Sequence, residues 1–201
     1  MRYGDFGAPA PPDPAIPAST KLRSNLATLY TIGHSTRSGE ELVRALRTHG
    51  VKTLVDIRAF PASRRLPQFN REALEKSLEA AHIRYVWMKG LGGYRKKSRS
   101  DSPNTALRNV SFRNYADHML TAEFKESVSE LLWEAELACT AYMCAERVWF
   151  QCHRMLVSDW LVAHGHRVLH IDGESTPREH RLTVEAHRVG DEVLYPGDRL
   201  F

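Results

Sequence analysis

The chain has 201 residues, 42% hydrophobic and 26% charged, with a formal net charge of +4. This size suits one globular domain whose core needs no disulfide or metal support, and the odd number of cysteines, three, argues against a disulfide framework. No apolar stretch approaches the ~20 residues that span a bilayer, and no secretory signal opens the sequence, so a cytoplasmic location without membrane contact is expected.

The mild excess of basic residues favours an anionic partner such as a phosphate or a nucleic acid. It does not select between these partners, and ordinary charge variation explains it equally well.

The first segment, residues 1–25, opens with many prolines and alanines and few large apolar side chains. Such a segment buries too little surface to offset its ordering entropy, so a disordered tail is expected. The folded domain is predicted to occupy residues 26–201.

Strands and helices alternate along this domain. Apolar, β-prone runs predict strands at 26–33, 51–58, 83–88, 140–144 and 167–171, with a short edge strand at 191–196. Apolar stripes predict helices at 38–50, 70–82, 111–120, 122–137 and 153–165, with Ser38, Asn70 and Thr121 as caps. This order predicts an α/β domain with a mostly parallel sheet of about five strands and helices on both faces.

In such sheets, ligands bind beyond the carboxyl ends of the strands. The segments that follow the first four strands are "GHSTRS", "DIRAFPASRRLPQFN", "KGLGGYRKK" and "CAERVWFQCHR", and all four should open onto one edge. The residues predicted to bind an anionic ligand there are Gly33, Ser35, Arg58, Ser63, Lys89, Gly92, Gly93, His153 and Arg154, and those predicted to catalyse are His34, Glu146 and Cys152.

Each assignment has a structural alternative. Arg58 follows an apolar strand, and a fixed guanidinium suits a phosphate or carboxylate, but Asp56 could simply pair with it. Glu146 is a candidate general acid or base, or it holds an arginine in place. His34 is a candidate proton donor or ligand in a turn that could equally be a plain strand-to-helix connection.

The cysteines admit several chemistries. Cys152 should lie at the start of a helix with Arg154 nearby, which favours a thiolate. A tyrosine-phosphatase loop is excluded, because the arginine it requires is replaced by Phe150 or Ser158. A metal site from Cys144, Cys152, His153 and His34 is conceivable, but the C-x7-C-H spacing matches no common zinc signature, so no metal ligand is assigned.

The loop from residue 89 to residue 109 is longer than usual and rich in glycine and basic residues, which is typical of a functional or a disordered loop. It is neither a P-loop nor a dinucleotide-binding motif.

The motifs "TIGHST", "VDIRAFPASRRLPQF", "GLGG", "MCAE" and "CHR", in this order, resemble the bacterial and archaeal family named domain of unknown function 488. The C-terminal "HI", "EHRLT" and "LYPG" are similar to that family's tail, so the likeness spans about residues 28–201. The resemblance implies no activity. In one departure, the family's often charged segment after "CAE" is the apolar "RVWFQ" here, which could pack against a ligand, a partner or the core.

The residues favour an enzyme for hydrolysis or group transfer on a small phosphate-bearing or nucleotide-like substrate, with cofactor and oligomeric state undetermined. One alternative is a redox or metal sensor that uses Cys144 and Cys152. Another is a non-catalytic nucleic-acid-binding module, in which Phe69 or Trp149 stacks on bases and the basic contacts are Arg64, Arg65, Arg95, Lys96, Lys97 and Arg99.

Overall fold

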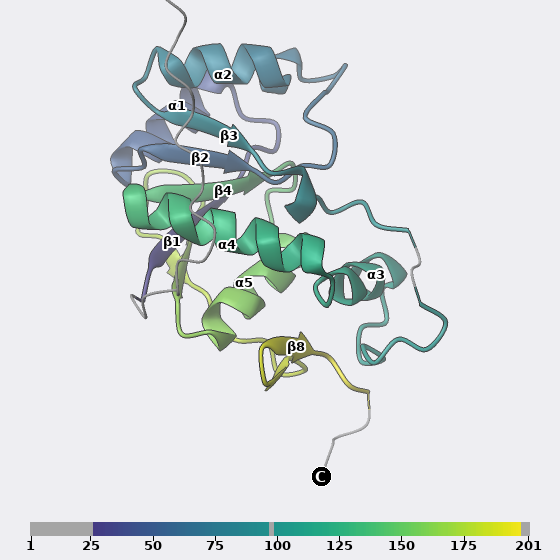
Figure 1. The fold of residues 1–201 in the computed structure, drawn as a ribbon. Coiled ribbons are helices and arrows are strands. Elements are labelled where there is room, and N and C mark those ends of the chain that lie inside the picture. The colour runs from purple at the N-terminus through teal and green to yellow at the C-terminus, as the bar shows by residue number, and fades with distance from the viewer. Residues whose placement is uncertain (1–25, 97–98, 198–201) are drawn as a thin grey trace, which may run out of the picture.

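The sheet has six strands in the order β3-β2-β4-β1-β5-β6 (Figure 1). A computed structural model describes residues 26–96 and 99–197. The parallel strands are β1 (Thr28–Gly33), β2 (Thr53–Asp56), β3 (Arg84–Trp87), β4 (Thr140–Cys144) and β5 (Arg167–Ile171). The two-residue β6 (Arg178–Glu179) pairs antiparallel with β5. The prediction of a mostly parallel sheet is confirmed, with six strands instead of about five.

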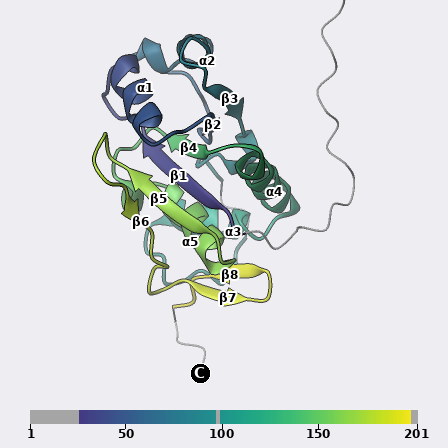
Figure 2. The same cartoon turned by 90° about the vertical axis from the view of Figure 1, so that its left-hand side faces the viewer.

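Helices cover both faces of this sheet, as predicted (Figures 1 and 2). One face carries α1 (Gly39–Thr48) and α2 (Arg71–Glu79), and the other carries α3 (Val110–His118), α4 (Ala122–Leu137) and α5 (Arg154–Ala163). Each layer of helices encloses its own apolar core, because successive strand side chains point to opposite faces. In the described part of the chain, no helix is both long and apolar enough to cross a membrane.

Three short 3-10 turns shape the connections near the carboxyl edge. They are Pro67–Phe69, Lys89–Leu91 and Trp149–Gln151, and each lies in a segment that follows a strand end. None of the three has a sequence signal of its own. The predicted tail at 1–25 lies outside the described residues.

The C-terminal region differs from the prediction. The segment predicted as an edge strand of the main sheet forms β8 (Glu192–Leu194), which pairs with β7 (His187–Val189) in a separate two-stranded sheet (Figure 2). All three residues of β7 are exposed, so the segment carries no apolar alternation that could predict a strand.

Local capping explains where α1 begins. Ser38 and Glu41 form the predicted capping box, with Glu41 N donating to Ser38 Oγ at 3.1 Å and Ser38 N donating to Glu41 Oε2 at 2.7 Å. Asn70 also occupies the predicted N-cap position, but its side chain accepts from the Ser63 amide at 2.6 Å instead of capping α2. Asn70 therefore fixes the loop after β2.

The sheet ladder between β1 and β4 continues past both strands. His34 N donates to Cys144 O at 3.0 Å, and Ser35 N donates to Ala145 O at 2.8 Å. Gly33 makes this approach feasible, because a Cβ at this position would collide with the backbone of Glu146 and Arg147. The turns after β1 and β4 are therefore held against each other.

Substitution of Gly33 by alanine should destabilise the protein by about 3 kcal/mol, because the backbone that it meets cannot swing away like a side chain. Chemical denaturation measures the loss. The matched control is Gly39→Ala in the first turn of α1, where the nearest atom is Ser77 Oγ at 3.9 Å and alanine should be neutral or favourable. Equal stabilities for the two variants would contradict this account.

Candidate functional site

The carboxyl edge of the sheet carries two polar clusters, one on each face. The ion-pair cluster comprises Asp56, Arg58, Tyr85 and His34, on the side of α1 and α2. The thiol cluster comprises Cys144, Cys152 and His153, on the side of α3 to α5. Because the chain passes from Asp56 through Ile57 to Arg58, the end of β2 separates the two clusters.

In the ion-pair cluster, Asp56 is the main hydrogen-bond partner of the Arg58 side chain. Arg58 Nε donates to Asp56 Oδ1 at 2.9 Å and to Oδ2 at 3.0 Å, and Nη2 donates to Oδ2 at 2.5 Å. The Tyr85 hydroxyl adds a bond to Oδ2 at 2.7 Å. Both charged side chains are buried, where an unpaired charge would be very unfavourable. The structural alternative for Arg58, an ion pair with Asp56, therefore describes this geometry.

His34 completes the ion-pair cluster as a neutral acceptor. Its Nδ1 lies 2.9 Å from the Ser35 carbonyl oxygen and must donate to it, so Nε2 presents its lone pair to Arg58 Nη1 at 3.3 Å. Burial, aided by the Arg58 charge, lowers the pKa of His34 to about 4. The ring also stacks on Phe69 with a centroid distance of 4.1 Å. Phe69 is fully buried, so its ring is not available for stacking on a nucleic-acid base.

The thiol cluster forms where β4 ends and α5 begins. His153 Nδ1 lies 3.5 Å from Cys152 Sγ and 3.7 Å from Cys144 Sγ. On the other side of the ring, Nε2 donates to the Ile57 carbonyl oxygen at 3.1 Å. That bond fixes the tautomer, because a carbonyl can only accept. The unprotonated Nδ1 of a neutral His153 therefore faces two sulfur atoms.

The two thiols differ in acidity. Burial opposes ionisation of Cys152, but a hydrogen bond from Cys144, the Arg154 charge and the Arg154 amide at 3.5 Å together lower its pKa to about 7. The hydrogen bond to Cys152, together with burial, raises the pKa of Cys144 to about 12. The pair therefore carries one thiolate near neutral pH, on Cys152.

Arg154 supports the loop between the two cysteines. Its side chain is almost fully buried, and Nη2 donates to the carbonyl oxygens of Glu146 at 2.5 Å and Arg147 at 3.0 Å. Nη1 donates to Thr31 Oγ1 at 2.9 Å. Among the residues that the structure describes, no carboxylate lies within 4 Å of this guanidinium. Arg154 thus holds the 146–147 turn and leaves positive charge beside Cys152.

The other predicted site residues lie around the two clusters. The Glu146 side chain is exposed and its carbonyl is bound by Arg154. Ser63 Oγ accepts from the Leu66 amide at 3.0 Å. Ser35 adopts a positive φ of 51° in the turn after β1. Lys89 is exposed in the glycine-rich loop.

The glycines serve close packing. Gly92 lies against Ala59, and Gly93 lies against the His153 ring so closely that a side chain there would displace the ring. The glycine-rich loop therefore borders the thiol cluster. Four of the basic residues considered for nucleic-acid contact are exposed: Arg64, Arg65, Lys96 and Arg99. Arg95 is partly buried and donates hydrogen bonds to carbonyl groups of its own loop and to Glu123. Lys97 lies outside the described residues.

Sequence reasoning missed a buried hydrogen-bonded chain that joins β1, β5 and α5. It runs from Thr31 through His170 and His180 to Asp159, with distances of 3.1, 2.9 and 2.9 Å. Tyr85, on β3, was also missed. The usable signal was a polar residue on the core face of an apolar strand, as His170 is beside Val168.

The model of the family "Domain of unknown function DUF488" matches residues 38–161. The chain belongs to this family. The matched range includes Arg58 and the whole thiol cluster, and it ends before β5 begins. Searches of curated proteins and of solved structures find no match.

The buried His34 should make stability depend on pH. Its pKa is about 4 in the folded protein and 6.5 in the unfolded chain, so the unfolded chain takes up the proton first as the pH falls. The stabilisation is therefore complete above pH 6.5 and is lost as the pH falls toward 4. Between pH 7 and pH 4 the wild type should lose about 3 kcal/mol more than His34→Gln, as measured by urea unfolding. Parallel losses in both proteins would contradict the assignment.

Proposed function

We propose that the thiol cluster binds a thiophilic metal ion, with Zn²⁺ the first candidate, and that the chain is a metal-dependent enzyme for small anionic substrates. The observation that carries the proposal is the orientation of His153, whose tautomer is fixed by Ile57 so that Nδ1 faces both sulfurs. A hydrogen bond on the far ring nitrogen is the usual partner of a metal-bound histidine.

The distances support tetrahedral coordination. A nitrogen and a thiolate bound to one tetrahedral Zn²⁺ lie about 3.6 Å apart, given bonds of ~2.1 and ~2.3 Å. The two separations in the protein are 3.5 and 3.7 Å. All three ligand atoms lie within 4.8 Å of one another. The set therefore needs little rearrangement to close on an ion.

The number of ligands favours a catalytic centre. Among the described residues, the cluster offers three protein ligands, and sites of three ligands keep a fourth position for water or substrate. A zinc ion with two thiolates is neutral, and Arg154 adds a positive charge with no carboxylate in contact. A net positive centre, bordered by the loop that carries Lys89, favours an anionic substrate. Hydrolysis and group transfer both fit such a centre.

A second candidate uses the same residues without a metal. Cys152 would be a nucleophile, His153 its base, and Ile57 the group that orients the base. The lowered pKa of Cys152 favours this candidate. Against it, Cys152 is only 3% exposed, and a second thiol shares the same nitrogen. The metal centre explains why two thiols share one nitrogen, and the nucleophile does not.

The metal proposal predicts about one zinc ion per chain in protein purified without chelator, measured by plasma mass spectrometry and by competition with a colorimetric chelator. Cys144→Ser, Cys152→Ser and His153→Ala should each weaken zinc binding by about 100-fold or more, because each removes a direct ligand. Cys139→Ser is the matched control, since Cys139 lies outside the cluster, and it should bind like the wild type. Wild-type protein that stays metal-free in excess zinc would contradict the proposal.

Alkylation separates the two candidates. In metal-free protein, iodoacetamide should modify Cys152 with a rate that is half-maximal near pH 7, ahead of Cys144 and of Cys139, whose pKa burial raises. Zinc should suppress this reaction if Cys152 is a ligand. Equal rates with and without zinc would support the nucleophile, and hydrolysis of small phosphate and carboxylate esters by zinc-free protein would do the same.

A further inference from the structure

A cavity opens at the β6 edge of the sheet, and none of the three thiol-cluster residues lines it. It has a volume of about 450 Å³ and is lined by Trp149, Arg178, Glu179 and Arg181. Trp149 belongs to the apolar segment between Cys144 and Cys152, and the other three belong to β6 and the residues after it. We propose that this cavity binds a mononucleotide, whose base stacks on Trp149 and whose phosphate pairs with Arg178 and Arg181. The inference does not depend on a metal in the thiol cluster.

The Trp149 indole is a rigid platform. The His170 ring stacks flat on it, with centroids 4.3 Å apart and planes 4° from parallel, and the His180 ring meets it edge-on at 4.9 Å. Both histidines are buried, so the indole rests on side chains that have little freedom to move. An aromatic ring that is fixed before binding loses little entropy when a planar ligand stacks on it.

Hydrogen bonds fix the orientation of the two histidines that contact Trp149. His180 Nε2 donates to Asp159 Oδ1 at 2.9 Å, so His180 Nδ1 accepts from His170 Nε2 at 2.9 Å. His170 Nδ1 then accepts from the Thr31 hydroxyl at 3.1 Å, and Thr31 accepts from Arg154. In this order each ring N–H and the Thr31 hydroxyl has one acceptor, so each imidazole has a single tautomer.

Asp159 closes the chain with a full set of partners. It also accepts from the Thr183 amide and hydroxyl at 2.9 and 2.7 Å and from the Tyr195 hydroxyl at 2.9 Å. Burial, with the charges nearby, lowers the pKa of His170 far below its usual range, which keeps the stacked imidazole uncharged. The Trp149 indole is therefore held in place by two hydrogen-bonded histidines.

The charges around the cavity suit an anion. In the part of the chain that the structure describes, no carboxylate lies within 4 Å of the guanidinium of Arg178 or Arg181. Glu179 is bound by Arg167 through bonds of 2.8 and 3.2 Å, so its charge is already paired. Two unpaired guanidinium groups beside an indole match a phosphate attached to an aromatic base.

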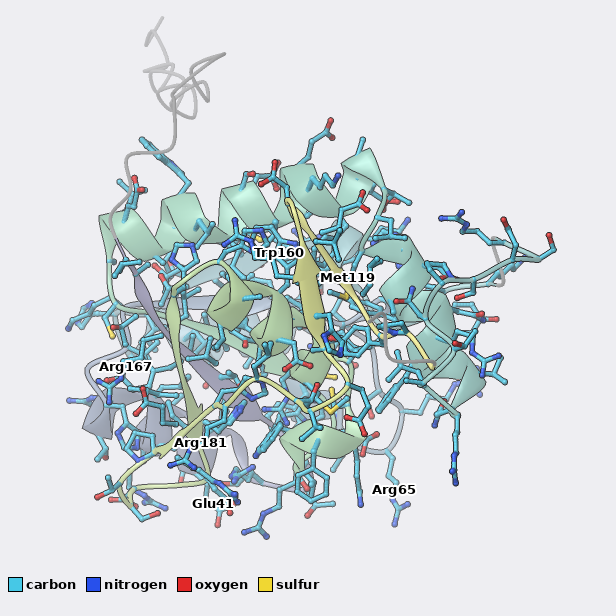
Figure 3. The ribbon with its side chains drawn as sticks, turned by 90° about the horizontal axis from the view of Figure 1, so that it is seen from below. Glu41, Arg65, Met119, Trp160, Arg167 and Arg181 are labelled. Carbon is cyan, nitrogen blue, oxygen red and sulfur yellow. The ribbon has the colours of Figure 1, made fainter. Side chains whose placement is uncertain are left out.

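The size of the cavity favours one nucleotide over a strand. Small-ligand pockets occupy about 300–1,000 Å³, and this cavity lies in that range. It contains a single aromatic platform, whereas single-strand grooves stack successive bases on several aromatic side chains. Figure 3 labels Arg181 and Arg65 at separate places on the molecule, and Arg65 does not line the cavity.

Calorimetric titration of the full chain with AMP, GMP, CMP and UMP tests the proposal. At least one should bind more than about tenfold more tightly than its nucleoside or inorganic phosphate alone, because the ring and the phosphate each contribute. Trp149→Ala should weaken that binding by about tenfold or more, and Trp149→Phe by less, because phenylalanine still offers a stacking face. Arg178→Gln and Arg181→Gln should each weaken it several-fold.

The control is Arg47→Gln, an exposed arginine on α1, which should bind like the wild type. Circular dichroism confirms that each variant is folded, and the arginine variants decide the outcome if Trp149→Ala is not. The proposal is overturned if no mononucleotide binds, if binding is unchanged in all the cavity variants, or if only single-stranded oligonucleotides bind.

Discussion

The hydrogen bond from His153 Nε2 to the Ile57 carbonyl is the interaction on which the account of the site depends. It crosses from the start of α5 to the end of β2, two segments separated by almost a hundred residues. Without it, the imidazole could turn either nitrogen toward the sulfurs. With it, the unprotonated Nδ1 of the neutral ring faces Cys144 and Cys152, and the end of β4 and the start of α5 together form one ligand set.

The surroundings of the thiol cluster explain how this geometry is maintained. Arg154 binds the 146–147 turn and Thr31, so the loop that carries Trp149 is fixed at its base. Arg154 is connected to the Asp159 carboxylate only through Thr31, His170 and His180. A direct ion pair would neutralise Arg154. The longer connection leaves its charge available to Cys152, while Thr31 and both histidines on the path are hydrogen-bonded.

Much of the fold follows from sequence pattern, because alternating apolar segments report a parallel sheet with two helical layers. The bounds of β4 and the capping box of α1 agree with the prediction. The roles of Tyr85 and Asp159 could not be predicted, since their hydrogen-bond partners Asp56 and His180 lie 29 and 21 residues away in the sequence. Arg58 was predicted as an anion ligand, with an ion pair to Asp56 as the alternative; the ion pair is present, and the burial of both side chains follows from packing that spacing does not encode.

The cysteine spacing shows the same limit. Zinc signatures recognise ligands that a short turn brings together, whereas Cys144 and Cys152 meet because a strand end and a helix start lie side by side. X-ray absorption at the zinc edge of zinc-loaded protein tests the central claim most directly. The account predicts two sulfur neighbours at ~2.3 Å and one or two nitrogen or oxygen neighbours at ~2.0–2.1 Å. A first shell of only nitrogen and oxygen would contradict it.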